Sequence, residues 1–174
     1  HFSYFDPGKV DAEVQGNLLN RMSRRGPDAE GSWSDDERCW LGFRRLAILD
    51  LSPAGNQPML TADGHFAIVF NGELYNFREL RKELESRSIQ FQSTSDSEVV
   101  LYALVEWGVQ ALNRVNGMFA LAFYDIHGKR LLLARDHAGI KPLYYLQCNR
   151  GIVFSSQYDS FLCHPWRQDL AVNL

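Results

Sequence analysis

The sequence of 174 residues predicts an α+β fold in which two packed sheets are covered by helices. Segments with the apolar pattern of strands lie near both ends of the chain, and segments with helical periodicity lie between them. The composition, 45% hydrophobic and 22% charged, is ordinary for a globular protein with a substantial core. The length suits a single domain, and the sequence contains no internal repeat.

The first half of the chain predicts a strand, an amphipathic helix and two further strands. Residues 1–5 alternate apolar and polar side chains, which is typical of the end of a strand. Apolar residues then recur at helical spacing from Val10 to Met22. Two segments rich in apolar and aromatic residues predict strands over 39–51 and 66–70. The Pro and Gly residues of 52–64 predict a loop between them.

Two helices and a run of strands are predicted for the second half. Asn76 is a good N-cap for a helix over 77–86, and Asp96 stands before the apolar residues of a second helix that ends at Gly108. From Gly117 onwards the pattern changes to strands separated by short turns. These strands are predicted over 119–124, 130–134, 143–146 and 152–154.

Charge and cysteine content narrow the choice of partners. A formal net charge of −3 and a pI near 5.9 give no electrostatic reason to expect nucleic acid or an anionic membrane, so a small polar substrate fits better. No apolar run approaches the roughly 18 residues that span a bilayer. Cys39, Cys148 and Cys163 form no CxxC pair, which indicates a reducing, cytoplasmic location. The histidines have no neighbours at metal-ligand spacing, so no metal is expected.

The stretch from Phe70 to Asn76 holds an amide, a glycine and a carboxylate side by side, in Asn71, Gly72 and Glu73. An Asn side-chain NH2 and a Gly backbone N–H can stabilise an oxyanion, and an adjacent Glu can bind a substrate ammonium. Asn-Gly between apolar runs is also the leading signal for a β-hairpin turn. Taken alone, these seven residues favour the turn.

Four further motifs change that balance. They are Arg25-Gly26-Pro27-Asp28, Thr94-Ser95-Asp96-Ser97-Glu98-Val99, Gly117-Met118-Phe119-Ala120, and the block from Arg135 to Tyr145. The ordered set resembles the glutaminase domain of the asparagine synthetase family, within the class II, N-terminal-nucleophile glutamine amidotransferases. The resemblance implies a four-layer αββα sandwich of two mainly antiparallel sheets flanked by helices. Sugar-phosphate and purine-pathway amidotransferases typically carry Arg-Gly-Tyr-Asp at the first motif, so the asparagine synthetase-like branch matches better.

The resemblance implies a role for Arg45 and Leu49. Arg45 matches the family's carboxylate-binding arginine, whose planar fork would bind the α-carboxylate of L-glutamine through two hydrogen bonds. A structural salt bridge is the alternative for an arginine in this position. Leu49 would contribute a backbone contact near the α-amine.

The same resemblance assigns the remaining site residues. Asn71 and Gly72 match the oxyanion hole, which makes them the predicted catalytic residues, and Glu73 matches a ligand of the substrate ammonium. Asp96 matches a second ammonium ligand, and its alternative role is that of a helix N-cap. The motifs around Arg25 and Arg135 are interpreted as structural, because charge pairs and a fixed turn would hold loops around the pocket.

A nucleophile is missing from the sequence as given. The family uses an N-terminal Cys whose own α-amine acts as the base, and His1-Phe2-Ser3-Tyr4 resembles the part that follows the usual Cys-Gly-Ile. The three cysteines present have acylated backbone nitrogens and cannot take this role. We expect the first residues to be missing, and the sequence as written to be inactive on glutamine. The alternative is a degenerate scaffold domain, similar to β-lactam synthetase-like relatives without the Cys.

The expected domain organisation follows from the resemblance. Residues 1–160 would form the glutamine amidotransferase type-2 domain, and 161–174 would begin a linker to an ATP-dependent synthetase domain. The glutaminase domain itself would need no cofactor, whereas the synthetase domain would use ATP and Mg and receive the ammonia. The resemblance also allows a homodimer. Two departures from the family pattern, Arg24 in place of a His and Gln157 in place of a Glu, concern loop packing and the domain boundary.

Overall fold

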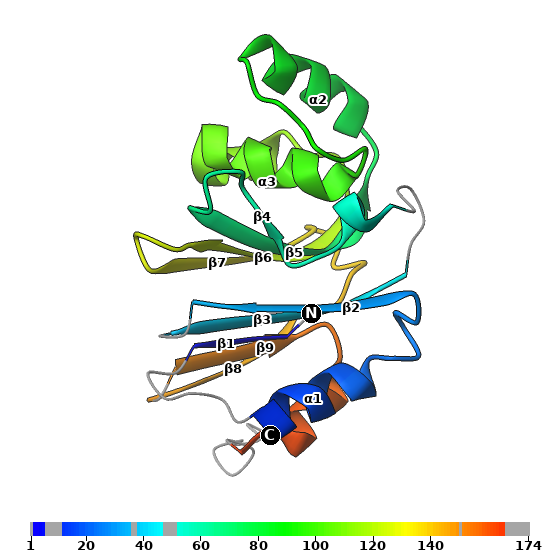
Figure 1. Ribbon diagram of the computed structural model, residues 1–174, viewed down its shortest axis with the longest axis vertical. Helices are drawn as coiled ribbons and strands as arrows, with labels where there is room; N and C mark the ends of the chain where they lie inside the picture. Colours follow the sequence, from blue (N-terminus) through cyan, green and yellow to red (C-terminus); the bar gives the residue numbers. More distant parts are fainter. Residues whose placement is uncertain (1, 6–11, 36–37, 47–51, 150, 166–174) are drawn as a thin grey trace.

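The computed structural model describes residues 2–5, 12–35, 38–46, 52–149 and 151–165. Two antiparallel sheets stack face to face, with helices α2 and α3 over the outer face of one sheet and α1 under the outer face of the other (Figure 1). This is the four-layer αββα arrangement that the resemblance implies. In the described part of the chain, every helix is too short or too polar to cross a membrane.

Nine strands make up the two sheets in the described residues. The sheet of order β2-β3-β1-β9-β8 contains β1 (Phe2–Phe5), β2 (Ala29–Ser34), β3 (Cys39–Arg45), β8 (Tyr144–Cys148) and β9 (Gly151–Ser155). The sheet of order β4-β5-β6-β7 contains β4 (Met59–Leu60), β5 (Phe66–Leu74), β6 (Gly117–Asp125) and β7 (Arg130–Arg135). The helices are α1 (Ala12–Arg21), α2 (Phe77–Ser86) and α3 (Asp96–Trp107), with 3-10 turns η1 (Pro53–Gly55), η2 (Gly108–Asn113) and η3 (Tyr158–Cys163).

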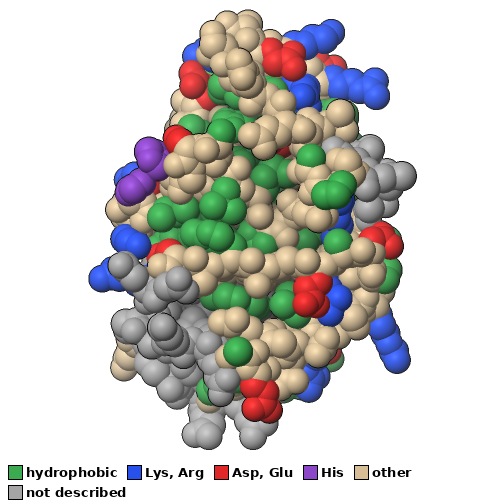
Figure 2. All heavy atoms as spheres, viewed as in Figure 1, with side chains coloured by type: hydrophobic (Ala, Val, Ile, Leu, Met, Phe, Trp, Pro, Cys, Tyr) green, Lys and Arg blue, Asp and Glu red, His purple; other side chains and the backbone are tan. Residues whose placement is uncertain are grey.

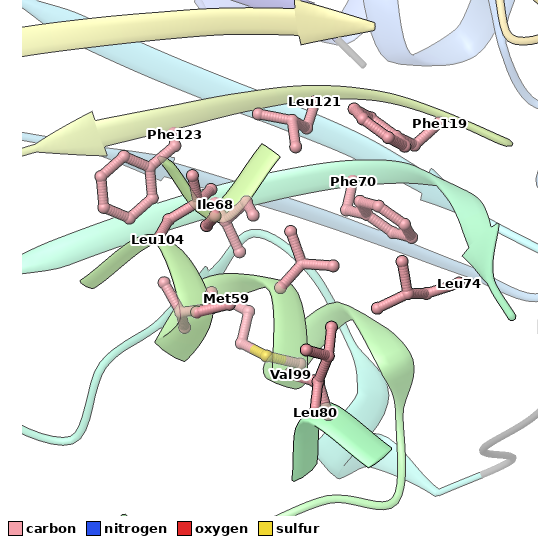
Figure 3. Packing of buried hydrophobic residues seen from close by; sticks show 14 of the residues in the cluster. Met59, Ile68, Phe70, Leu74, Leu80, Val99, Leu104, Phe119, Leu121 and Phe123 are labelled. Carbon is pink, nitrogen blue, oxygen red and sulfur yellow. The ribbon is translucent and has the colours of Figure 1, made fainter. Parts of the chain in front are cut away.

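Strands β5 and β6 are buried on both faces, because their side chains alternate between two cores. On the helix side, Ile68 and Phe70 of β5 and Leu121 of β6 pack against the apolar residues of α2 and α3 (Figure 3). On the other side, Val69 and Tyr124 pack against the first sheet. A third core lies between α1 and the first sheet, formed by Leu18, Leu19, Met22, Trp40, Val153 and Phe161.

The surface of the sandwich mixes apolar and charged groups. Hydrophobic side chains gather across the middle of the face shown in Figure 2, over the stacked sheets. Lys and Arg side chains are interspersed with Asp and Glu around the edge of that face (Figure 2). The charges on this face therefore do not form a patch of one sign.

Most predicted elements are present, and several predictions are wrong. The strand predicted over 39–51 ends at Arg45, and residues 47–51 lie outside the described residues. The predicted loop over 52–64 contains β4, and a strand that the sequence did not predict, β2, lies on the edge of its sheet. Its sequence, Ala-Glu-Gly-Ser-Trp-Ser, lacks the β-branched residues that mark strands. Asn76 occupies the N-cap position of α2 without a side-chain cap bond. Its amide instead donates to the Arg114 carbonyl and accepts from the Asn116 N–H.

A buried carboxylate ties the two sheets together. Asp35, between β2 and β3, accepts hydrogen bonds from the Tyr124 hydroxyl of β6 at 2.8 Å and from Lys129 Nζ at 3.2 Å. Its other oxygen accepts from the backbone N–H groups of Arg38 and Cys39. The tip of the β2–β3 hairpin is thereby anchored to the second sheet.

Removing one of these donors should weaken the contact between the sheets. Tyr124→Phe deletes a hydrogen bond to a buried charged group, so we expect the free energy of unfolding to fall by about 1.5–3 kcal/mol in urea titrations at pH 7. Tyr102→Phe is the matched control, because the Tyr102 hydroxyl only accepts a long, exposed bond of 3.4 Å from the Ala62 N–H. Equal losses in the two variants would contradict the anchoring role of Asp35.

Candidate active site

A pocket of about 410 Å³ opens where the two sheets and the start of α3 meet. It is lined by residues from β3, β5, β6, α3 and the loops beside them. Five of the six site residues predicted from the sequence line it together: Arg45, Asn71, Gly72, Glu73 and Asp96. The sixth, Leu49, lies outside the described residues. Sequence positions from 45 to 96 thus converge on one cavity.

Asn71 and Gly72 lie within strand β5 and not in a turn. Residue pairing with β6 continues without interruption from Phe66 to Leu74, so that Asn71 faces Ala120 and Gly72 faces Phe119. The hairpin interpretation of Asn-Gly is therefore wrong, because a long partner strand extends the ladder past the glycine. A Cβ on Gly72 would collide with the Met118 carbonyl and lie 2.8 Å from the Phe119 Cα. Only glycine permits β6 to approach this closely.

Arg45 ends β3 with its side chain almost wholly buried. Its Nη1 donates to the Ser52 carbonyl at 2.8 Å and to Asn56 Oδ1 at 2.7 Å. These two bonds orient the guanidinium. The residues on either side of η1 thus hold the arginine side chain at the pocket wall.

The Arg-Gly-Pro-Asp motif supports the same end of β3. A Cβ on Gly26 would lie 2.6 Å from the Arg44 carbonyl oxygen and 2.7 Å from the Arg45 nitrogen. Asp28 donates its N–H to the Arg45 carbonyl at 3.0 Å, and Arg25 Nη1 donates to the Ser156 carbonyl at 2.9 Å. The motif therefore packs directly against the backbone that positions Arg45.

Asp96 is the first residue of α3, and the N-cap is its neighbour Ser95, whose Oγ accepts from the Glu98 N–H. The predicted capping role of Asp96 is wrong, because Ser95 already fills that position. Asp96 Oδ2 instead accepts a hydrogen bond from the Leu74 N–H of β5 at 2.9 Å. One carboxylate thus connects α3 to the strand that carries Asn71 and Gly72.

Two carboxylates, those of Glu73 and Asp96, lie close together on one side of the pocket. Burial raises the pKa of the Asp96 carboxyl above its ordinary value, and the nearby charge of Glu73 raises it further, although the Leu74 N–H opposes both effects. Glu73 is exposed to solvent at the pocket. Two carboxylates facing the same space favour a bound cation, while Arg45 favours an anion. This pairing of charges complements the ammonium and carboxylate of a free α-amino acid.

The block from Arg135 to Tyr145 forms a fixed turn beside the pocket, as predicted. The Asp136 carboxylate accepts from the N–H groups of Phe119, Ile140 and Lys141. Burial alone would raise the pKa of Asp136, but the hydrogen bonds from Lys141, Ile140 and Phe119 outweigh it and hold the pKa below its usual range. Lys141 lies on the pocket wall, a position that the sequence analysis did not predict.

The N-terminal strand also points to the pocket. In the register of β1, Phe2 lies opposite Gly42 of β3 and Ser155 of β9. The next residues along those partners, Phe43 and Ser156, line the pocket. The N-terminal end of β1 therefore lies at the edge of the cavity. Within the part of the chain that is described, no group of three His, Cys, Asp or Glu side chains is arranged to hold a metal.

Gly26→Ala and Gly16→Ala should have opposite effects on stability. The added methyl at position 26 collides with backbone, so we expect a loss of about 1–3 kcal/mol, the usual range for overpacking. Gly16 lies inside α1, and apart from its chain neighbours and the backbone of its own helix no atom lies within 4 Å of the added Cβ, so the same change should gain about 0.5–1 kcal/mol through helix propensity. Urea titrations of both variants measure the difference. A neutral Gly26→Ala would show that the motif does not constrain β3.

Asp96→Asn should flatten part of the pH dependence of stability. In the wild type, the raised pKa makes the contribution of this carboxyl complete below its unfolded value of 3.8. The contribution is lost as the pH rises through the folded-state pKa, because the buried group must then ionise. Asparagine stays neutral and keeps an oxygen for the Leu74 N–H. The free energies of unfolding of wild type and variant, measured between about pH 4 and pH 7, should therefore be similar at the low end of this range. As the pH rises, the variant should become increasingly more stable than the wild type. Parallel curves would contradict the raised pKa.

Comparisons with known proteins agree with this geometry. A family model described as a glutamine amidotransferase domain matches residues 2–173. Asparagine synthetase [glutamine-hydrolyzing] 3 of Bacillus subtilis is 38% identical over 157 residues, which cover 89% of this chain and 25% of that protein. Asparagine synthetase [glutamine-hydrolyzing] 1 of the same organism is 40% identical over 152 residues, covering 85% of this chain and 24% of that protein. Amidase chry2 of Gibberella zeae is 37% identical over 158 residues, covering 90% and 23%.

Solved structures show the same fold. The glutamine phosphoribosylpyrophosphate amidotransferase from B. subtilis superposes with a TM-score of 0.77 at 18% identity, over 93% of this chain and 42% of that chain. The predicted sandwich of the N-terminal-nucleophile type is therefore confirmed. The chain spans about a quarter of the length of the curated relatives described above. On the match of the family model over residues 2–173, the chain belongs to the glutamine amidotransferase domain family.

Proposed function

We propose that this chain is the glutaminase part of an asparagine synthetase-type amidotransferase, which releases ammonia from L-glutamine. The observation that carries the proposal is the convergence of Arg45, Asn71, Gly72, Glu73 and Asp96 on one pocket. The first of these would bind the α-carboxylate of glutamine, and the two acidic residues would bind its ammonium. Leu49 would add a backbone contact near the same amine.

Held at both ends of its amino-acid group, glutamine would present its side-chain amide to a nucleophile. We propose that the nucleophile is an N-terminal cysteine ahead of His1, since β1 directs its N-terminal end towards the pocket residues Phe43 and Ser156. The cysteine thiolate would attack the amide carbon, and its own α-amine would carry the proton. The Asn71 side-chain NH2 and the Gly72 N–H would stabilise the resulting oxyanion. Ammonia would leave, and water would then hydrolyse the thioester to give glutamate.

The released ammonia would go to a synthetase region of the same protein or of a partner, as the names of the asparagine synthetase relatives suggest for those proteins. ATP and Mg would be needed only in that region, and the glutaminase part would use no cofactor. We further propose a cytoplasmic location, which the cysteine pattern supports, and regard a homodimer as compatible with the fold.

The proposal is tested with protein expressed from the complete reading frame. An electrophilic glutamine analogue should add once, on the N-terminal cysteine, as seen by intact mass and peptide mapping. The rate of glutamate and ammonia release should fall in proportion to labelling. Excess glutamine should protect the cysteine from the analogue. An adduct on Cys39, which is buried, or full activity after complete labelling would overturn the assignment. If the native protein has no N-terminal cysteine and still binds glutamine, the degenerate scaffold is supported instead.

Arg45 provides the quantitative part of this test. Arg45→Ala removes a charge-assisted bidentate contact, so we expect glutamine binding to weaken by more than about 2 kcal/mol, or roughly 30-fold, in calorimetric titrations. Arg45→Lys keeps the charge without the planar fork and should fall between the wild type and the alanine variant. Unchanged affinity in a folded Arg45→Ala variant would return Arg45 to a structural role.

A further inference from the structure

Gln57 is a buried amide at the back of the pocket, and the sequence analysis assigned it no role. Its side chain is 6% exposed and lines the cavity. Oε1 accepts a hydrogen bond from the Phe70 N–H at 2.6 Å, and Nε2 donates to the Phe70 carbonyl at 3.0 Å. The second hydrogen of Nε2 goes to Ser97 Oγ at 3.1 Å. Both backbone groups of Phe70 are thus bonded to one side chain.

The position of Gln57 in the sheet explains this arrangement. Strand β4 pairs with β5 so that Met59 lies opposite Ile68 and Leu60 opposite Ala67. Continuing that register by two residues places position 57 opposite Phe70. The Gln57 side-chain amide supplies there the donor and the acceptor that a neighbouring strand backbone would supply. The edge of β5 is therefore held by a side chain at the residue directly before Asn71 and Gly72.

The same amide reaches the acidic side of the pocket through Ser97, which follows Asp96 in the first turn of α3. The backbone of Gln57 packs closely against Gly31 of β2, where a Cβ would collide with the Gln57 carbonyl. Gln57 is thus packed against one sheet, hydrogen-bonded to the other and hydrogen-bonded to α3. A buried network in which every group has a partner is rigid, since losing any one bond leaves a polar group without water or a partner.

We propose that Gln57 is a positioning residue for amide hydrolysis: it fixes the strand that carries the oxyanion donors relative to the helix that carries the ammonium ligand. The inference rests on the proposed function of Asn71, Gly72 and Asp96. Gln57 makes two hydrogen bonds with the backbone of Phe70, next to the oxyanion donors, and one with Ser97, next to the ammonium ligand. Loss of the amide should therefore affect kcat more than KM. A displacement of about 1 Å at a catalytic group can lower the rate roughly 100-fold.

Gln57→Glu gives a test that a general loss of packing would not mimic. An ionised carboxylate can accept from the Phe70 N–H but repels the Phe70 carbonyl, whereas a protonated carboxyl restores that donor. Burial favours the protonated form of the introduced group. We therefore expect kcat of Gln57→Glu to be about 100-fold below wild type at pH 8 and to recover as the pH falls, expressed as the ratio to wild type at each pH. A flat ratio across pH would overturn the proposal.

Two further variants separate positioning from stability. Thr61→Val is the matched control, because Thr61 is equally buried and its Oγ1 accepts from the Phe66 N–H at the opposite end of β5, outside the pocket. It should lower stability and leave kcat within about twofold of wild type, as expected for a site without contact to the reacting groups. Ser97→Ala cuts only the bond to α3 and should raise KM more than it lowers kcat. Losses of kcat in Thr61→Val as large as those in Gln57→Glu would contradict a specific role.

Hydrogen exchange provides a readout that needs no activity. In Gln57→Leu, the backbone N–H groups from Phe70 to Leu74 should exchange faster than in wild type, while those of Phe66 to Ile68 should not. Unchanged exchange in the first segment would overturn the positioning role, whatever the kinetics show. If the wild-type protein with its native N-terminus lacks glutaminase activity, the proposed function fails, and the exchange data still decide whether Gln57 fixes this strand.

Discussion

The pairing of β5 with β6 is the constraint on which the rest of the molecule depends. It runs from Phe66 opposite Asp125 to Leu74 opposite Gly117. One face of this strand pair packs against α2 and α3, and the other packs against the first sheet, of order β2-β3-β1-β9-β8. The predicted oxyanion donors Asn71 and Gly72 lie inside the pairing, so they have the rigidity of the core and not that of a loop. Preorganised donors are the kind that stabilise a developing charge without reorganisation.

The first residue of α3, Asp96, is a buried carboxylate with an electrostatic cost. Placing Asp96 in a buried position beside Glu73 disfavours its charged form. The folded protein is therefore less stable with Asp96 ionised than it would be with a neutral side chain at this position. A substrate ammonium between the two carboxylates would remove that penalty. The pocket thus keeps an electrostatic cost of folding that a bound cationic group would offset, as is common at binding sites. Arg45, oriented from the opposite wall by Ser52 and Asn56, supplies the complementary charge.

The sequence predicted the fold class and five of the residues that meet in the pocket, because these stand in short motifs with defined chemistry. It missed β2, whose polar composition suits an edge strand, and it missed Gln57. The single signal for Gln57 was a polar residue before a proline in a loop, and nothing in that pattern shows that its amide would bond to Phe70. It also placed the helix cap at Asp96 and not at Ser95, since neighbouring capping residues cannot be ranked without the backbone. The site roles themselves stay predictions.

Glycines that are required for packing persist in a motif whether or not the domain is still active. Gly26 and Gly72 are required where another backbone approaches, and Asp96 holds the Leu74 N–H. A descendant that had lost its chemistry would still retain both glycines, because the close backbone contacts of the fold require them, and would need at position 96 only a side chain with an acceptor oxygen. Glu73 is different, since its side chain is exposed at the pocket and a substitution there would disturb little packing. Among relatives of this domain, drift at Glu73 would therefore be an earlier sign of lost selection for glutamine than any change in the glycines.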